Sequence, residues 1–217
     1  MAGVRKDLGF ISDITMPAMG LLPRPRGTPP HPVDFLGDLV DPAYRQDRRT
    51  RTYPARATQA SRWFRTSKDG ELVARKGGKL EEHEYSNHEP RIIEKFQHMI
   101  DSGGEIPEKY RTKKFAQRVI PRRWGDSGPS ITATSLPDDY VHFSQPRTLT
   151  VREWARIQTF PDWYKFAGKR TTGGRRRAGD PSKGDWERDL PKYTQVGNAV
   201  PVWLAEEIGK HFQQLLA

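Results

Sequence analysis

The chain has 217 residues, no cysteine and a formal net charge of +10. The lack of cysteine excludes disulfides, cysteine-ligated zinc and a thiolate nucleophile, and a hydrophobic content of 34% leaves at most one domain or one and a half with a modest core. The basic balance favours a polyanionic partner, whereas no apolar run is long enough for a membrane span and no signal peptide is evident, so we expect a cytoplasmic location and no membrane contact.

Residues 1–32 contain six prolines and are predicted to form an arm or linker, because proline and glycine leave no room for a helix or strand. The segment Val33–Val40 is apolar and is predicted to form one helical turn, which Asp41-Pro42 would end. The first packed part of the chain is therefore expected to begin near residue 31.

Between residues 45 and 79, eleven basic side chains face only three acidic ones, and the aromatic residues Tyr53, Trp63 and Phe64 lie among them. Basic groups bind the DNA backbone and forked or planar side chains reach bases, so the composition favours DNA binding over a solvated basic loop. Alternating pieces on either side of residues 68–70 predict a strand, a turn and a second strand. The candidate DNA-binding residues of this segment are Arg51, Arg62 and Arg65.

A helix is predicted from Pro90, a residue that suits the first turn, to the stop at Ser102-Gly103-Gly104. Its apolar residues fall at helical spacing and are expected to face a core: Ile92, Ile93, Phe96, Met99 and Ile100. Three histidines nearby are expected to be surface or capping residues rather than metal ligands, because no cysteine or tight carboxylate pattern accompanies them: His83, His88 and His98.

Residues 105–146 remain basic and contain the β-favouring run Ile131–Thr134. Arg122 is a candidate for contact with DNA phosphates. The alternative is that Arg122 and Arg123 only solvate the edge of a sheet.

The string from 147 to 161 predicts a short helix with sharp ends. Thr150 and Glu153 form a capping box, so the helix should begin at Val151, and Pro161 should stop it. Its basic residues lie at the start and along one side: Arg147, Arg152 and Arg156. They predict a rigid wedge of guanidinium groups, with Arg147 as a DNA-binding candidate, and the plainer alternative is a capped surface helix with ion-paired arginines.

Residues 169–177 form a basic, glycine-rich stretch without an acidic residue. Glycines allow close approach to a partner, so Arg175 and Arg176 are candidates for phosphate contact. A disordered charged loop is the alternative interpretation.

The end of the chain predicts a helix that begins at Pro201. Gly197-Asn198 would lie in the preceding turn, where amides at a helix start could face a ligand carboxylate or ribose; an ordinary turn before a core helix is the alternative. The helix carries an apolar stripe that we expect to be poorly covered in the isolated chain: Leu204, Ile208, Phe212 and Leu215.

Two strings carry a resemblance to a known family. Residues 147–168, RTLTVREWARIQTFPDWYKFAG, and residues 193–201, YTQVGNAVP, resemble two signature blocks of the DNA cytosine-5-methyltransferases, in that family's order. The resemblance implies that the first block packs a target-recognition domain against the catalytic domain and that the second lines part of the S-adenosylmethionine pocket. It implies structural roles for Thr150, Arg152 and Glu153 and cofactor binding by Gly197, Asn198, Ala199 and Val200.

The family's chemistry, as the resemblance implies, flips cytosine out of the duplex, attacks C6 with a cysteine thiolate and methylates C5 from S-adenosylmethionine. The Pro-Cys dipeptide, the glycine-rich cofactor loop and the Gln-x-Arg-x-Arg string that serve this chemistry are absent. We therefore expect no catalytic residue in this chain, inactivity in isolation and a separate catalytic chain as partner. Val202 stands where the family often has a second proline, and Ala199 lacks the hydroxyl of the common serine.

The expected fold class is α/β, with a small mixed recognition lobe and a C-terminal helix that completes a Rossmann-like methyltransferase domain supplied largely elsewhere. The expected domains are an arm at 1–30, a target-recognition lobe at 31–146 and signature blocks with the helix at 147–217. The expected function is that of a C-terminal portion or subunit of a DNA cytosine-5-methyltransferase of the restriction-modification type, acting on double-stranded DNA. The alternatives are a non-catalytic DNA-binding protein or methyltransferase remnant, and an RNA-associated protein supported by charge alone.

Overall fold

The computed structural model describes residues 28–111, 117–125, 138–171, 182, 184 and 190–216, with side chains of the last helix described to residue 214. The chain divides into two compact units, one of residues 30–199 and one that joins residues 1–29 to residues 200–217. We call the first unit the body. Most of the predicted arm, the run Ile131–Thr134 and the glycine-rich stretch from 172 onward lie outside the described residues.

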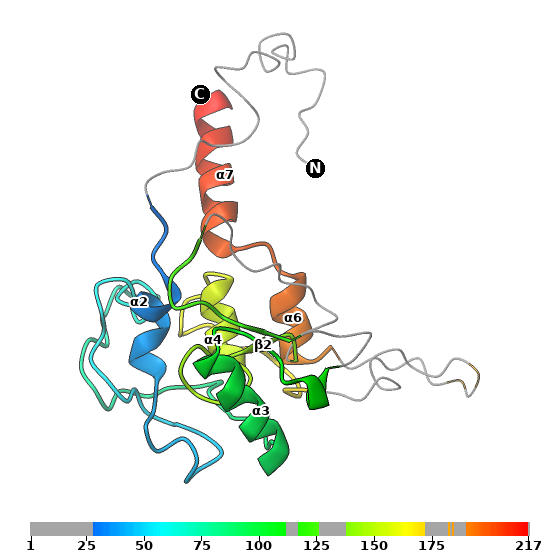
Figure 1. Ribbon diagram of the computed structural model, residues 1–217. Helices are drawn as coiled ribbons and strands as arrows, with labels where there is room; N and C mark the ends of the chain where they lie inside the picture. The colour runs from blue at the N-terminus through cyan, green and yellow to red at the C-terminus, as the bar shows by residue number, and fades with distance from the viewer. Residues whose placement is uncertain are drawn as a thin grey trace. The chain divides into compact units, whose positions relative to one another are not determined.

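The described part of the body is a mixed assembly of short helices and one small sheet (Figure 1). Strands β1 (Arg118–Val119) and β2 (Tyr140–Val141) pair in parallel, with Arg118 opposite Tyr140. A mixed α and β composition was predicted, and the structure confirms it. The helical elements of the body are α2 (Pro32–Leu36), η2 (Gly37–Leu39), α3 (Pro90–Asp101), η3 (Glu108–Tyr110), α4 (Val151–Ile157) and α6 (Lys192–Asn198).

Helix α7 (Val202–Leu216) belongs to the other unit. Pro201 directly precedes it, and the Pro201 carbonyl accepts a hydrogen bond from the Ala205 amide at 3.0 Å. On the predicted apolar stripe Leu204 is 46% exposed, whereas Ile208 and Phe212 are partly buried. The side chain of Leu215 lies outside the described residues.

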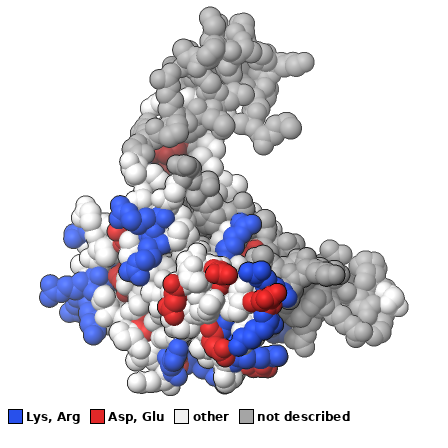
Figure 2. Space-filling view, viewed as in Figure 1, with Lys and Arg blue, Asp and Glu red and all other residues white. Residues whose placement is uncertain are grey.

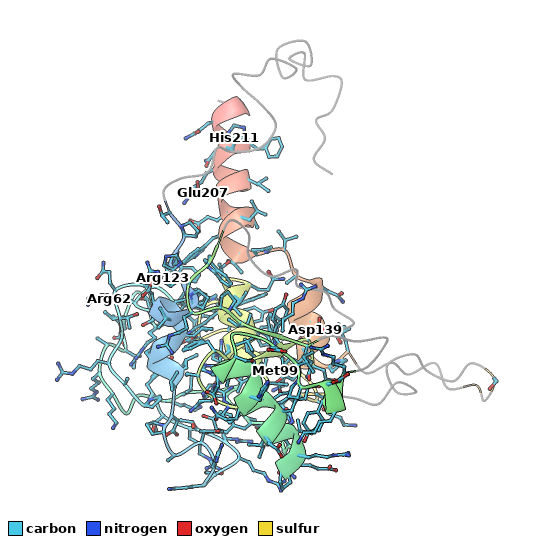
Figure 3. All side chains as sticks on the ribbon, in the orientation of Figure 1. Arg62, Met99, Arg123, Asp139, Glu207 and His211 are labelled. Carbon is cyan, nitrogen blue, oxygen red and sulfur yellow. The ribbon has the colours of Figure 1, made fainter. Side chains whose placement is uncertain are left out.

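Helices α2 and α3 form where the sequence predicts them. In α2 the Asp34 carboxylate accepts a hydrogen bond from the His31 amide, and Pro32 occupies the first turn. In α3 the buried Phe96 and Met99 pack against Val141 of β2; Figure 3 labels Met99 on the helix. Two glycines with positive φ, Gly103 at +72° and Gly104 at +113°, end α3, as the Ser-Gly-Gly stop predicts.

The strand–turn–strand prediction for residues 62–75 is only partly right. An isolated antiparallel bridge joins Thr66 to Leu72 around a tight turn, but residues 59–65 form turns rather than a strand. The Arg65 amide donates to the carbonyl of Ser61, which is a turn geometry. A hydrogen-bonded turn thus replaces the first predicted strand, and the Arg65 side chain at its end is buried in the protein interior.

Helix α4 is the buried element of the body, with all residues from Val151 to Arg156 inaccessible. The predicted capping box is present, since the Glu153 amide donates to Thr150 Oγ1 at 3.2 Å and the Thr150 amide donates to Glu153 Oε2 at 2.8 Å. The predicted surface wedge is wrong. Arg147 is 2% exposed, and Arg152 and Arg156 are completely buried, so these guanidinium groups serve the interior.

Arg147 is neutralised by the residue that caps α4. Its Nη1 and Nη2 atoms donate to the two Glu153 carboxylate oxygens at 2.8 and 2.6 Å, and its Nε donates to Gln145 Oε1 at 2.9 Å. Burial alone would raise the pKa of Glu153, but the facing Arg147 charge outweighs burial and holds that pKa far below its usual range.

A second group of buried charges joins α4 to distant segments. Arg156 donates to Asp38 Oδ1 at 2.5 Å and to Asp162 Oδ2 at 2.6 Å, and Arg65 donates to Asp38 Oδ2 at 3.1 Å. The Tyr53 hydroxyl donates to Asp162 at 2.7 Å. We call Asp38, Arg65, Arg156 and Asp162 the buried ionic cluster. It connects η2, the end of α4 and residues 45–79, which we call the basic segment, through charged groups that water does not reach.

Two buried histidines complete this interior. His83, expected to be a surface or capping residue, is fully buried, with its ring nitrogens 2.9 Å from Oγ1 of the α4 N-cap residue Thr150 and 3.0 Å from the Leu39 carbonyl oxygen. His142 Nδ1 accepts from the amides of Ser144 and Gln145. Burial lowers the pKa of His83 to about 4 and that of His142 to about 3, so both rings are neutral at pH 7.

The ionic cluster predicts a large cost for removing one partner. Arg156→Met should lower the free energy of unfolding by about 3–5 kcal/mol, because Asp38 and Asp162 would remain buried without their principal cation. The matched control is Arg91→Met, since Arg91 and Glu89 form an exposed pair with side chains 71% and 68% accessible; its effect should stay within about 0.5 kcal/mol. Urea denaturation measures both, and equal effects would contradict the prediction.

The buried histidines predict a loss of stability in mild acid. In the unfolded chain the two histidines titrate at about pH 6.5. Between about pH 6.5 and 4 the unfolded state therefore binds more protons than the folded state, and the free energy of unfolding decreases as the pH is lowered. At pH 5 the loss should be on the order of 2 kcal/mol per histidine. Glu153 and Asp162, whose pKa values are lowered, add to the loss only below about pH 4.5.

Urea titrations at pH 7 and pH 5 measure this dependence. His142→Gln should reduce it, whereas the same change at the exposed His98 should leave it intact. Equal stability of the wild-type chain at the two pH values would refute the assignment of neutral buried rings.

Candidate nucleic-acid interface

The structure separates the predicted DNA-binding arginines into exposed and buried ones. Arg51, Arg62 and Arg122 are exposed, and Arg51 pairs with Asp47 at 2.9 Å. Arg65 and Arg147 are 2% exposed and bind Asp38 and Glu153, so their prediction as DNA contacts is wrong. Their charges are already compensated inside the protein. The remaining two candidates, Arg175 and Arg176, lie outside the described residues.

Two basic segments meet at α2. The Phe35 ring of α2 lies 5.9 Å from the Phe64 ring and 6.5 Å from the Trp124 ring, and the Val33 amide donates to the Arg122 carbonyl. Residues 62–64 and residues 122–124 thus both contact the short helix α2, and Figure 3 shows Arg62 and Arg123 beside it. We call the three exposed arginines that result the basic edge: Arg62, Arg122 and Arg123.

The basic edge carries charge that is not neutralised. Within the described residues no acidic group pairs with any of its three arginines. Arg122 instead lies over the Phe143 ring, 5.4 Å from its centroid. Figure 2 shows further Lys and Arg side chains along the loops of residues 45–80, whereas acidic and basic groups alternate elsewhere on this face. Unpaired exposed cations are the groups that bind a phosphate backbone.

The aromatic residues of the basic segment divide in the same way. Tyr53 and Phe64 are buried, so they are not accessible for stacking, whereas Trp63 is 38% exposed. A further exposed ring, Trp163, was not predicted; Lys68 Nζ lies 4.7 Å from the centroid of that ring. Its position after α4 gave no local signal that it would lie near the basic segment.

The predicted cofactor segment, residues 197–200, ends helix α6 and is followed in the sequence by α7, which begins at Val202. Gly197 and Asn198 form the last residues of α6, and the Ala199 amide donates to the Val196 carbonyl, so the prediction of free amides at a helix start is wrong. Gln158 of the α4 C-cap donates through Nε2 to the carbonyls of Val196 and Ala199 at 3.1 and 2.9 Å.

The groups that this segment presents suit one wall of a cofactor pocket. The Asn198 side chain is exposed and can donate to or accept from a ribose or carboxylate, while the neighbouring carbonyls are occupied by Gln158. Val200, which falls in the other unit, is 59% exposed. Within the body, the exposed Asn198 side chain is thus the group of this segment that fits part of a cofactor such as S-adenosylmethionine.

Two other classes of site have no candidate in the described part of the chain. It holds no group of three or more His, Asp or Glu side chains that could bind a metal ion. No described helix is long and apolar enough to cross a membrane.

Comparisons with known proteins give the family. The model for the family described as C-5 cytosine-specific DNA methylase matches residues 34–214. Type II methyltransferase M.AquIB of Picosynechococcus sp. is 35% identical over 138 residues, which are 63% of this chain and 90% of that protein. Type II methyltransferase M.Eco47II of Escherichia coli is 32% identical over 164 residues, which are 69% of this chain and 34% of that protein.

The relatives differ in how much of their length is matched. Type II methyltransferase M.DdeI of Desulfomicrobium norvegicum is 42% identical over 82 residues, and the match spans only 17% of that protein. The chain thus spans most of one short relative and about a third or less of the two longer ones. The family match covers both signature blocks and most of the described body, and with it this chain belongs to the C-5 cytosine-specific DNA methylase family.

Proposed function

We propose that this chain supplies the target-recognition part, and one wall of the cofactor pocket, of a DNA cytosine-5-methyltransferase whose catalytic groups reside in another chain. The observation that carries the proposal is the buried helix α4, whose sequence resembles a signature block of the family, in a chain without any cysteine. M.AquIB supports it as a family member so short that 138 residues are 90% of its length.

The division of labour follows from the chemistry. C5 of cytosine becomes nucleophilic only after a thiolate adds to C6, and this chain has no thiol. S-adenosylmethionine, when bound, supplies the methyl group. The exposed Arg51, Arg62 and Arg122, together with Arg175 and Arg176, are proposed to bind the DNA backbone and so orient the duplex for base flipping.

The cofactor segment has a narrower role in this proposal. Asn198 would contact the cofactor through its exposed side-chain amide, with Gly197 and Ala199 forming the adjacent surface. Gln158 keeps the end of α6 in place, because it holds two carbonyl groups that would otherwise need water.

Reconstitution tests the proposal. The chain mixed with a family chain that carries the Pro-Cys dipeptide and the glycine-rich cofactor loop should transfer methyl groups to cytosine in duplex DNA, whereas either chain alone should not. Incorporation of tritiated methyl groups measures the transfer. A mixture no more active than the catalytic chain alone would favour a non-catalytic DNA-binding protein, and methylation by this chain alone would refute the proposal.

The basic edge predicts salt-dependent binding of DNA. Changing Arg62, Arg122 and Arg123 together to Gln should weaken duplex binding and make the slope of log affinity against log salt shallower by about 1 for each arginine that binds a phosphate. The matched control is Lys109→Gln, because Lys109 is exposed but already paired with Glu94. Fluorescence anisotropy over a salt series measures both variants. A triple variant with the wild-type slope would exclude the basic edge from the interface.

A further inference from the structure

A half-open cleft in the body lies apart from the basic edge. It has a volume of about 200 Å³ and lies between residues 44–48, residues 85–88 and the buried Arg147. The rings of Tyr44 and Tyr85 meet edge to face at 5.8 Å and form part of its wall, and the Arg147 guanidinium lies 4.8 Å from the Tyr85 ring centroid. The cleft thus has a rigid aromatic wall against a buried ion pair.

The backbone on both sides of the cleft is fixed. The Tyr85 amide donates to the Arg48 carbonyl at 2.8 Å, and an antiparallel bridge joins Arg49 to Glu84. The Tyr85 hydroxyl is 2.6 Å from Thr50 Oγ1. Side chains that project from these segments therefore start from defined positions, which a specific contact with a ligand requires.

The charges around the cleft are distributed unevenly. Of the four arginines between 45 and 51, Arg49 pairs with Glu84 and Arg51 pairs with Asp47, and neither of these two lines the cleft. The two that do line it, Arg45 and Arg48, have no acidic partner within the described residues; Arg45 Nε donates to the Tyr44 hydroxyl. The acidic Asp47 also lines the cleft, but it pairs with Arg51, and Arg147 is neutralised by Glu153. Arg45 and Arg48 are therefore the lining cations that have no acidic partner among the described residues.

The cleft also presents groups that can read nucleobases. Asn87 is exposed at the cleft, and its side-chain carboxamide has no hydrogen-bond partner within the part of the chain that the structure describes. The Arg48 guanidinium is likewise unbonded there. A free guanidinium matches the O6 and N7 acceptors of guanine, and a free carboxamide matches N6 and N7 of adenine, each through two hydrogen bonds.

We propose that this cleft is a base-reading site of the recognition lobe, in which Arg48 and Asn87 bind base edges in the DNA major groove while Arg45 binds a neighbouring phosphate. The inference rests on the proposed function, since it assumes that the body binds duplex DNA. It assigns sequence discrimination to the cleft, whereas the basic edge supplies affinity that does not depend on sequence.

Selection from a pool of duplexes with a random central segment tests this assignment. The wild-type chain should enrich a defined motif. Arg48→Ala and Asn87→Ala should each lose the preference at a different position of that motif, with discrimination falling about five- to a hundredfold. Arg62→Ala, a change on the basic edge, should lower affinity for all duplexes alike and leave the motif unchanged.

A conservative variant separates reading from charge. Arg48→Lys keeps the positive charge but lacks the forked geometry, so it should retain overall affinity and still lose the preference. Circular dichroism and thermal unfolding confirm that each variant is folded. Arg48 and Asn87 are exposed and make no side-chain bond within the described residues, so their replacement should leave the fold intact.

The outcomes distinguish this inference from the proposed function. An unchanged motif in both alanine variants would overturn the base-reading role of the cleft while DNA recognition by the chain stands. A uniform loss of affinity, equal to that of Arg62→Ala, would reduce the cleft to a site of phosphate binding and overturn the role as well. A wild-type chain that binds no duplex would overturn the inference and the proposed DNA interface together.

Discussion

The body depends on the neutralisation of buried arginines by carboxylates, of which Glu153 and Asp162 lie close to their arginines in the sequence and Asp38 lies far away. Arg156 on α4 binds Asp38 from η2 and Asp162 from the loop that follows the helix. Arg65 of the basic segment shares Asp38. With only 34% hydrophobic residues the chain has a limited apolar core, and these ion pairs fix the relative positions of segments that apolar packing alone would leave less defined. Removing water from both partners makes the geometry demanding, because each buried charge depends on its protein partners, which include the carbonyls of Phe35, Ala55 and Arg75 as well as the facing charges.

This arrangement explains which features the sequence could predict. The capping box of Thr150 and Glu153, the start of α3 at Pro90 and its stop at Gly103 are local signals, and the structure confirms each of them. The burial of α4 was not predictable in the same way. Its arginines give it the appearance of a surface helix, and the acids that neutralise Arg156 belong to other segments, as Asp38 shows. Local composition shows that a side chain is charged, whereas its burial depends on whether the tertiary structure places an oppositely charged group next to it.

The same limit applies to the candidate interface. Charge density correctly indicated the segment 45–79 as exposed and basic, but it could not separate the buried Arg65 from the exposed Arg62 three residues earlier. Nor could it show that Arg49 and Arg51 are paired while Arg45 and Arg48 line a cleft. For the cofactor segment, Pro201 placed Gly197 and Asn198 in a turn before the last helix, whereas they end a second helix, α6, which was not predicted from the sequence.

Arg152 has a consequence for how such a lobe can diversify. Its guanidinium binds only main-chain oxygens among its hydrogen-bond acceptors: the carbonyls of Glu81, Pro161 and Tyr164. Every amino acid offers the same carbonyl, so this clamp is indifferent to the side chains of the residues that it holds. The proposed recognition role would thus allow substitutions at exposed positions of the neighbouring loops to change contacts with DNA while the hydrogen bonds of Arg152 stay intact.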